Sequence, residues 1–421
     1  MTVLRSPRHR VGVLLLLGAL SAFAPLSFDL YLPALPQLAT SLHTSDSLAQ
    51  WTMSVCMIGL AVGQLVAGPL SDHVGRRRPL IVGVAVYAAT ALLCAAAPDV
   101  AVLIVLRLVQ GLAGAAGIVV ARAVVRDIYE GHQLARIFSL LGLVTGAAPV
   151  IAPLLGGQLL RLTDWRGLFV VLFLIGLLVL LACATVLPET LPASDRVGGQ
   201  SELPHAMTSL WRDRAFVGCT VAILLVGCSF FTYISLSSFV LQVHYGLSAQ
   251  VFSYVFGVNS AGIMLGGYLN ARLVRRIGAP RMLLAALGLA AAAGVACAAA
   301  VELRLGLGGL LPPLFVVVAC MGLVQPNLTA LGLLHHAPRA GTASAVLGTA
   351  QFLGGSLTPP LVTAVVGATG ASMTLTIAVG TLAALAVTVA IAMPAVRASA
   401  LTNRNSEAKV VTYQPSSEEP G

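Results

Sequence analysis

The sequence predicts an all-α integral membrane protein of twelve transmembrane helices, arranged as two six-helix bundles related by pseudo-two-fold symmetry. Of its 421 residues, 58% are apolar and 9% are charged, whereas soluble domains carry about 25% charged residues. Apolar stretches recur along nearly the whole chain, each long enough at ~1.5 Å per residue to cross a hydrocarbon layer of ~30 Å. Landmarks of the first half also recur in the second half. The composition and the apolar runs indicate that the protein folds in a lipid bilayer, and the recurring landmarks indicate two related halves.

Each expected helix is a continuously apolar run, unlike the alternating strands of a membrane β-barrel. The first run resembles a secretory signal peptide, because arginines precede it and Ala22–Ala24 has the form of a cleavage site. Pro25 directly follows and should hinder cleavage, so this run is retained as the first helix. The twelve expected helices span residues 11–30, 50–71, 79–97, 100–122, 136–160, 167–187, 215–240, 248–271, 279–300, 307–331, 341–365 and 371–394.

One long polar interval divides these helices into six and six. Residues 188–214 are rich in Pro, Ser, Gly and charged side chains, which is typical of a linker. The expected N-terminal bundle therefore covers residues 11–187 and the C-terminal bundle residues 215–396, with residues 1–10 as a short N-terminal segment. Residues 397–421 are rich in Ser, Glu and Asn and are expected to be a disordered tail.

The two halves share landmarks at a nearly constant offset. The stretch Gly68–Arg78, after the second run, has a weaker counterpart in Gly267–Gly278 after the eighth. Gly142 precedes Pro153 by eleven residues in the fifth run, and Gly348 precedes Pro359 by eleven in the eleventh. An internal repeat of this kind predicts two related bundles around a central cavity.

The net charge of +9 reflects membrane topology and not a nucleic-acid surface. All but four of the 24 Lys and Arg residues fall on the side that also holds both chain ends. Arg161, Arg166 and Arg304 lie on the opposite side, and Arg107 lies within a helix. The positive-inside rule therefore places both termini in the cytoplasm. The arginine- and alanine-rich, lysine-poor composition suggests a bacterial genome, and hence a bacterial inner or plasma membrane.

Neither a metal nor another cofactor is expected. The seven cysteines all fall within the expected helices without a C-x-x-C pair, which favours small buried hydrophobic side chains. The eight histidines lack metal-ligand spacing.

Asp29 and Arg107 are the two charged residues expected inside the membrane. An ionised side chain there costs about 2.5–3.5 kcal/mol, so such residues are kept mainly where they face a cavity or a partner. Both lie at a similar depth in the expected topology and are candidates for a pair. Asp29 would then bind and release a coupling proton while Arg107 tunes its proton affinity. The alternative is a static pair that fixes two helices, or an Asp29 that merely caps its helix.

Gly68–Arg78 is the most specific stretch of the chain. Gly68 is followed by Asp72, by Gly75 at a tight turn, and by Arg76 and Arg77 at the expected cytoplasmic helix end. The alternative is a basic loop that only sets topology.

Two later stretches favour close contacts between helices. Arg107, Gln110, Gly111 and Gly114 lie on neighbouring faces of the fourth expected helix, where the glycines let another helix approach. Gln110 is equally compatible with an ordinary interhelical hydrogen bond. The fifth helix combines glycines with prolines, which suits a hinge between rocking bundles; these residues are Gly142, Gly146, Pro149, Pro153, Gly156 and Gly157.

Together these stretches resemble the major facilitator superfamily over about residues 11–395, and within it the drug:proton antiporters with twelve spans. Gly68–Arg78 is similar to the family's motif A, Arg107–Gly114 to motif B and Gly142–Gly157 to the antiporter motif C. His73 departs from motif A, where a basic residue is frequent. The resemblance implies the major facilitator fold and export rather than uptake.

Four shorter stretches look more specifically like the Bcr/CflA (bicyclomycin/chloramphenicol resistance) subfamily. They are Asp29–Pro36, Trp165–Phe169, Pro188–Thr190 and Gly341–Ala345. That subfamily is associated with efflux of antibiotics such as bicyclomycin, chloramphenicol and florfenicol, and of small metabolites.

The expected mechanism is alternating access by a monomer in the bilayer, with one proton entering as one neutral or weakly polar small molecule leaves. A nutrient importer, a non-transporting sensor and a membrane-embedded enzyme are the alternatives. Motif C disfavours the first, the short tail the second, and the lack of clustered catalytic side chains the third. Candidate residues of the substrate cavity, each equally open to a packing role, are Tyr31, Phe231, Tyr233, Asn259, Gln325, Asn327 and Gln351.

Overall fold

The computed structural model describes residues 7–129, 131–192, 210–334, 336 and 340–396, and most of these residues are helical. The predicted all-α membrane fold is confirmed. Within the described ranges, nine helices are long and apolar enough to cross a membrane, and a bent pair near the N-terminus makes a tenth. Two more long helices, α11 (Ala249–Ile277) and α14 (Ala340–Val366), occupy the eighth and eleventh positions along the chain.

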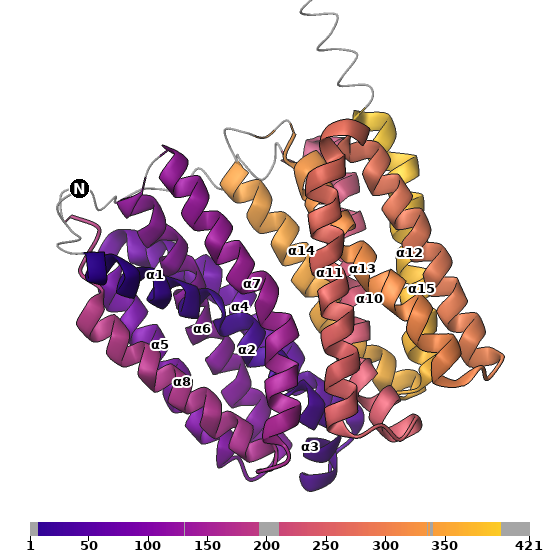
Figure 1. The fold of residues 1–421 in the computed structure, drawn as a ribbon, viewed down its shortest axis with the longest axis horizontal. Coiled ribbons are helices and arrows are strands. Elements are labelled where there is room, and N and C mark those ends of the chain that lie inside the picture. The colour runs from indigo at the N-terminus through magenta and orange to yellow at the C-terminus, as the bar shows by residue number, and fades with distance from the viewer. Residues whose placement is uncertain (1–6, 130, 193–209, 335, 337–339, 397–421) are drawn as a thin grey trace, which may run out of the picture.

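The remaining elements follow the chain in the order predicted (Figure 1). The first half contains α1 (Pro7–Ser21), α2 (Phe23–Asp29), a 3-10 turn (Leu32–Ala34), α3 (Leu35–Ser41), α4 (Asp46–Val74), α5 (Arg77–Ala95), α6 (Val100–Ile128), α7 (Gly131–Leu159) and α8 (Trp165–Val186). The second half contains α10 (Arg214–Phe239), a π-helical segment (Val240–His244), α11, α12 (Ala279–Glu302), α13 (Gly306–Gly332), α14, α15 (Gly370–Val387) and a second π-helical segment (Thr388–Ala392).

The first membrane span is broken, and the predicted continuous helix over residues 11–30 is wrong. Its two parts, Val11–Ser21 and Pro25–Ser41, are bent by 44° relative to each other. Pro25 lies just after the break, where a missing backbone donor and the proline ring disfavour a continuous helix. Pro33 and Pro36 sit where the chain then turns from α2 into α3. Asp29 thus ends a short helix.

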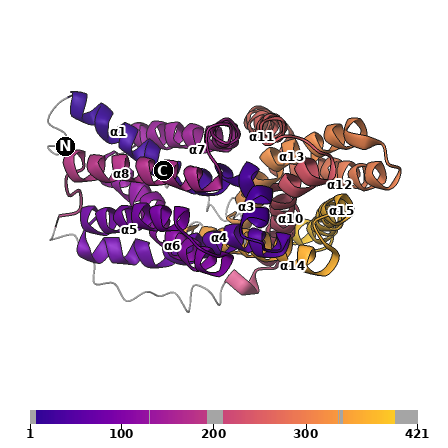
Figure 2. The ribbon, with the colours of Figure 1, turned by 90° about the horizontal axis from the view of Figure 1, so that it is seen from below.

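The two halves repeat the same packing (Figure 1, Figure 2). In the first half α4 packs on α6, α5 on α6 and α8, and α2 on α7; in the second half α11 packs on α13, α12 on α13 and α15, and α10 on α14. Between the halves, α4 contacts α14 and α7 contacts α11. Each of these contacts in one half has its counterpart at the equivalent position of the other, which is the pseudo-two-fold arrangement predicted from the sequence repeat.

Helices α4 and α11 occupy equivalent positions in the two halves, and the same residue types begin and end them. Ser45 caps α4 by accepting a hydrogen bond from Leu48 N at 3.3 Å, and Ser248 caps α11 by accepting one from Val251 N at 3.3 Å. Each helix ends at a glycine in the left-handed region, Gly75 with φ 101° and Gly278 with φ 86°. An arginine-rich turn lies beside each glycine: Arg76–Arg78 follow Gly75, whereas Arg275 and Arg276 precede Gly278 in the last turn of α11. We call the end of the molecule that carries these turns the basic end, and the opposite end the distal end.

Glycines let α4 and α6 approach more closely than side chains would allow. A Cβ on Gly63 would lie 2.5 Å from the carbonyl oxygen of Leu112, and one on Gly111 would overlap the carbonyl of Cys56. Gly266 and Gly322 make the equivalent contact between α11 and α13. The α4–α6 pair in the first half and the α11–α13 pair in the second half are therefore tightly packed.

The predicted tail at residues 397–421 and most of the predicted linker lie outside the described residues. The division of the chain at residues 188–214 stays a prediction.

Candidate functional site: a cavity between the two halves

Both halves line one large cavity of about 1310 Å³ at the centre of the molecule. The first half contributes residues of α1, α2, α4, α6 and α7, and the second half residues of α10, α11, α13 and α14. At the basic end the lining reaches Arg126, in the last turn of α6. The cavity therefore runs from that end into the interior.

Hydrogen bonds close the cavity at the distal end. Six side-chain hydrogen bonds join the halves in the described part of the chain, and all six lie there. The pairs are Ser47 with Pro360 O, Gln50 with Thr363, Gln158 with Tyr254, Gln250 with Gly157 O, Ser238 with Leu32 O, and Gln242 with Pro33 O. At the basic end, no hydrogen bond between described residues joins the halves. The molecule is therefore closed at the distal end, whereas at the basic end the cavity lining reaches the exposed side chains of Arg122 and Arg126.

Asp29 lies deep in this cavity. It is the last residue of α2, is 6% exposed, and lines the cavity beside Phe28. Among the described residues, it is the only carboxylate in the lining, and no hydrogen bond or ion pair between described side chains reaches it. Its neighbours across the cavity are the aromatic side chains of Tyr233 and Phe256. A buried carboxyl that faces a cavity without a counter-ion is placed to exchange a proton with the water or ligand inside it.

Arg107 does not pair with Asp29, so the pairing considered from the sequence is not made in this structure. Arg107 is fully buried and points into the packed interior of the first half, away from the cavity. It donates hydrogen bonds to the carbonyl oxygen of Ser27 at 2.6 Å, to the carbonyl oxygen of Thr52 at 3.3 Å and to Oε1 of Gln110 at 2.6 Å. The physical reason is that backbone carbonyl oxygens of α2 and α4, together with Gln110, occupy the hydrogen-bond donors of its guanidinium, which leaves none directed at Asp29.

Aromatic rings complete the surroundings of Arg107. Its guanidinium carbon lies 4.6 Å from the centre of the Tyr31 ring and 5.5 Å from that of Phe169. Since Ser27 is two residues before Asp29, Arg107 holds in place the short helix that carries the acid. Gly111 and Gly114 on the same helix contact α4 and the Tyr87 ring, as the predicted close approach requires.

Three of the seven predicted cavity residues line it. Phe231, Tyr233 and Gln325 do so, and Asn259 stands behind Tyr233, donating a hydrogen bond of 3.0 Å to its hydroxyl. The other three predicted residues do not line the cavity in this structure, because other contacts hold them. Tyr31 is fully buried against Arg107 and bonds Thr52; Asn327 bonds Asn270 at 2.6 Å; and Gln351 lies outside the lining, where its carbonyl packs on Gly227.

The stretch Gly68–Arg78 forms a polar cluster at the basic end of the first half. Arg76 donates to Asp72 and Ser71, and through Nε to Asp127 at 3.0 Å. The backbone N–H groups of Arg76 and Arg77 donate to the Glu189 carboxylate at 2.8 and 3.2 Å. The cluster thus joins the ends of α4 and α6 to the segment after α8. Gly68 lies alongside α6, with Val119 3.7 Å from its ideal Cβ position.

The glycines of α7 fall into two groups. Gly156 and Gly157, near the distal end, pack so closely on the carbonyl of Leu30 and on Ser253 that a Cβ would overlap either neighbour. Gly142 and Gly146 line the cavity nearer the basic end, and nothing lies within 4 Å of a Cβ built on either of them. Pro149 lines the cavity between the two groups, and Pro153 lies one turn further on. The predicted close packing of α7 is therefore found near its distal end, whereas its glycines near the basic end have no close neighbour.

Sequence reasoning missed three features of the lining. Phe28 and Phe256 carry no signal beyond that of ordinary apolar residues. Arg122 and Arg126 were assigned to topology alone, although their spacing of four residues places both on one face of α6.

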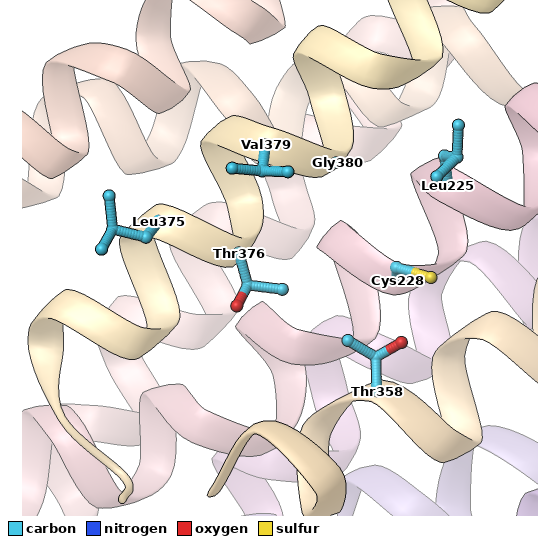
Figure 3. Close-up of a pocket in the computed structure, with 7 residues that line it drawn as sticks. All are labelled: Leu225, Cys228, Thr358, Leu375, Thr376, Val379 and Gly380. Carbon is cyan, nitrogen blue, oxygen red and sulfur yellow. The ribbon is translucent and has the colours of Figure 1, made fainter. Parts of the chain in front are cut away.

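A second pocket of about 340 Å³ lies between α10, α14 and α15 (Figure 3). Its lining is mostly apolar and shares no residue with the central cavity. Cys228, Thr358 and Thr376 are its most polar side chains, so it offers no charged group. The central cavity is therefore the candidate transport site.

Comparison with known proteins agrees with this architecture. The sequence profile of the Major Facilitator Superfamily matches residues 17–359. The chain belongs to the Major Facilitator Superfamily. It is accordingly a multi-pass membrane transporter and not an enzyme.

Relatives in this superfamily cover most of the chain. The chain is 37% identical over 384 residues to the uncharacterized MFS-type transporter YdgK of Bacillus subtilis (strain 168), an alignment that covers 89% of this chain and 95% of that one. It is 30% identical to a bicyclomycin resistance protein homolog of Haemophilus influenzae, with coverage of 86% and 92%. These matches confirm the resemblance to drug transporters of the Bcr/CflA type.

A solved structure shows the same fold. The crystal structure of a mutant of the nucleoside transporter NupG superimposes with a TM-score of 0.72 at 13% identity, covering 89% of this chain and 98% of that one.

Proposed function

We propose that this protein exports small molecules in exchange for protons by alternating access. The proposal is carried by the central cavity, which is closed at the distal end, reaches the basic end and holds one buried carboxyl group, Asp29. The similarity to a bicyclomycin resistance protein homolog supports export of drugs or related small molecules.

The proposed orientation follows from charge. The basic end faces the cytoplasm, as the positive-inside rule requires, and both termini lie there. The structure then represents the inward-open state of a monomer in a bacterial cell membrane, ready to take up substrate from the cytoplasm. The proton gradient is the energy source, and no cofactor takes part.

The proton step centres on Asp29. In the inward-open state substrate enters the cavity and the Asp29 proton leaves to the cytoplasm. Once the distal hydrogen bonds part and the basic end closes, substrate leaves to the outside and a proton returns to Asp29. Arg107 keeps its place throughout, because its bonds to Ser27 O and Thr52 O tie the acid-bearing segment to α4.

One acid in the cavity implies one proton per cycle. A charge that crosses 100 mV gains about 2.3 kcal/mol, so a proton motive force of about 150 mV supplies ~3.5 kcal/mol. This sustains a gradient of a few hundredfold for a neutral substrate. The aromatic and amide walls suit neutral or weakly polar compounds such as phenicols or bicyclomycin.

Respiring everted membrane vesicles test this proposal. Their lumen is acidic, and a pH-sensitive fluorophore reports proton release when chloramphenicol, florfenicol or bicyclomycin is added outside. We expect at least one compound to cause dequenching with the wild type and none with Asp29→Asn.

The alternative function, proton-coupled uptake of a metabolite or nutrient, gives a different result in the same vesicles. A symporter moves proton and substrate out of the lumen together, so compounds added outside cause no dequenching, whereas a substrate loaded into the lumen accelerates proton loss. Dequenching by Asp29→Asn at the wild-type rate would contradict the proposed role of Asp29.

A further inference from the structure

Two arginines stand on the wall of the central cavity near its basic end. Arg122 and Arg126 lie one helical turn apart on α6, both line the cavity and both are exposed. We infer that they form an anion-selective entrance, through which compounds carrying a carboxylate, sulfonate or phosphate group enter in preference to cations. This inference rests on the proposed function, because it concerns the substrates of the same cavity.

In the part of the chain that the structure describes, no acid pairs with Arg122 or Arg126. No hydrogen bond or ion pair between described residues reaches either guanidinium. Asp127, the next residue along α6, instead accepts hydrogen bonds from Arg76 Nε at 3.0 Å and from Thr190 at 2.8 Å. Asp72 is likewise engaged by Arg76. Among the described residues, Asp72 and Asp127 are thus engaged by the polar cluster around Arg76, and the guanidinium groups of Arg122 and Arg126 keep their positive charge on the cavity wall.

The wall opposite these arginines is uncharged. α14 contributes Ser344, Ala345 and Gly348 to the lining and, deeper in the cavity, Thr349. In the described part of the second half, the carboxylates are Asp213, which contacts His336 at 3.0 Å outside the lining, and Glu302, at the distal end of α12. Neither contributes to the cavity lining, so a mobile anion in the cavity is the natural partner of the arginines.

The entrance and the proton site are separate along the cavity. Arg107, whose bond to Ser27 O marks the level of the Asp29 segment, precedes Arg122 by fifteen residues on α6. At ~1.5 Å per residue the separation is roughly 22 Å. A substrate therefore passes the two arginines before it reaches Asp29, and the arginines act on entry without competing with the proton step.

Topology alone does not account for this placement. The positive-inside rule favours arginines at this end but is indifferent to the direction they face. Arg281, at the start of α12, satisfies the same rule while α12 contributes nothing to the cavity lining. It is the matched control for the test.

The expected effect on entering ions follows from Coulomb's law. At a separation on the order of 10 Å in water, each arginine changes the local concentration of a monovalent ion by about twofold. Together the two arginines raise the local concentration of a monovalent anion about fourfold and lower that of a monovalent cation about fourfold. The ratio of anion to cation concentration at the entrance therefore rises on the order of tenfold. Salt screens the effect, because the Debye length is ~10 Å at 0.1 M ionic strength.

Charged thiol reagents measure this ratio directly and need no turnover. Thr349→Cys places a thiol in the lining, deeper than Arg122 from the basic end, and no native cysteine lines the cavity in the described residues. The purified full chain is treated with anionic sulfonatoethyl methanethiosulfonate or with cationic trimethylammonioethyl methanethiosulfonate. Labelling of the chain without Thr349→Cys is subtracted, and each rate is divided by that for a free thiol in solution.

We expect the normalised anion-to-cation rate ratio to fall on the order of tenfold when Arg122→Gln and Arg126→Gln are combined with Thr349→Cys, and to be unchanged by Arg281→Gln. Raising the salt concentration should lower the ratio only where both arginines are present. A neutral methyl methanethiosulfonate should label all variants at the same rate, which shows that the cavity remains folded and open. An unchanged ratio in the double variant, or an equal fall with Arg281→Gln, would overturn the inference. Failure of drug export in vesicles would leave this result intact, so the two proposals fail separately.

Discussion

The closed distal end depends on a contact that leaves no room for a side chain at Gly156. In this structure the α-carbon of Gly156 lies against the carbonyl of Leu30, and an alanine Cβ would overlap that oxygen. The neighbour is backbone, so it cannot rotate away as a flexible side chain would. Both residues lie in the first half, so Gly156→Ala acts by pushing α7 from the segment after α2. The Leu32 and Pro33 carbonyls of that segment accept hydrogen bonds from Ser238 and Gln242 of the second half, and their displacement weakens the closed distal end.

The size of the effect follows from the overlap. Inserting a methyl group into a packed contact costs typically about 1–3 kcal/mol. The displaced segment relieves this overlap when the hydrogen bonds to Leu32 and Pro33 part, so the conformational equilibrium shifts towards the distally open state by up to roughly 5- to 150-fold. Gly142→Ala on the same helix has nothing within 4 Å and should leave the closed distal end unaltered.

Spin labels on the two halves at the distal end report this shift. Leu162, after α7, and Leu303, after α12, are 86% and 69% exposed and tolerate a label. We expect double electron–electron resonance to show a longer-distance population that grows in Gly156→Ala and not in Gly142→Ala. Identical distance distributions in the wild type and Gly156→Ala would refute the packing argument, as would an equal shift with Gly142→Ala.

Three further substitutions test other parts of the account. Arg107→Lys should lower coupled export at least tenfold with normal membrane expression, because an ammonium cannot reproduce the guanidinium fork; wild-type export would contradict this. Arg76→Gln should lower the free energy of unfolding by about 1–3 kcal/mol through loss of the partner of Asp127, and an unchanged melting temperature would argue against it. Thr363→Val should favour distal opening by about 0.5–1.5 kcal/mol, since it removes a hydrogen bond to the buried Gln50; unchanged distances between the distal spin labels would count against that role.

Much of the fold was predictable because its physical causes are local. Long apolar runs, serines at helix starts and glycines at helix ends are properties of neighbouring residues. Ser45 and Gly75 bound α4 as Ser248 and Gly278 bound α11, so the repeat could be detected before any contact was known. The bend in the first span was missed because the apolar run continues across Pro25, and hydropathy is insensitive to a lost backbone donor.

The candidate site was less predictable because it depends on which way side chains face. Asp29 and Arg107 lie at similar depth, yet one faces the cavity and the other the interior of the first half. Tyr31, two residues after Asp29, turns inwards to cover Arg107. Arg122 and Arg126 looked like topological charges until the structure showed them on the cavity wall. Helix rotation, which sequence fixes only weakly, decides each of these cases.

The glycines of α7 add a conformational element that sequence alone cannot assign. Gly157 packs on Ser253 of the second half and Gly142 is open because the molecule is closed at one end only. When the basic end closes, α7 near Gly142 must approach the second half, and the small residues there allow it. The glycines near the distal end of α7 thus serve the distally closed state, and those near its basic end serve the state in which the basic end is closed.

The central claim is that Asp29 couples transport to protons without being needed for the motion itself. Proteoliposomes containing wild type or Asp29→Asn, loaded with a compound exported in the vesicle assay, separate these roles. We predict that Asp29→Asn exchanges internal for external labelled compound at close to the wild-type rate without a gradient, yet fails to accumulate it when a pH gradient is imposed. Gradient-driven accumulation by Asp29→Asn at the wild-type rate would contradict the account.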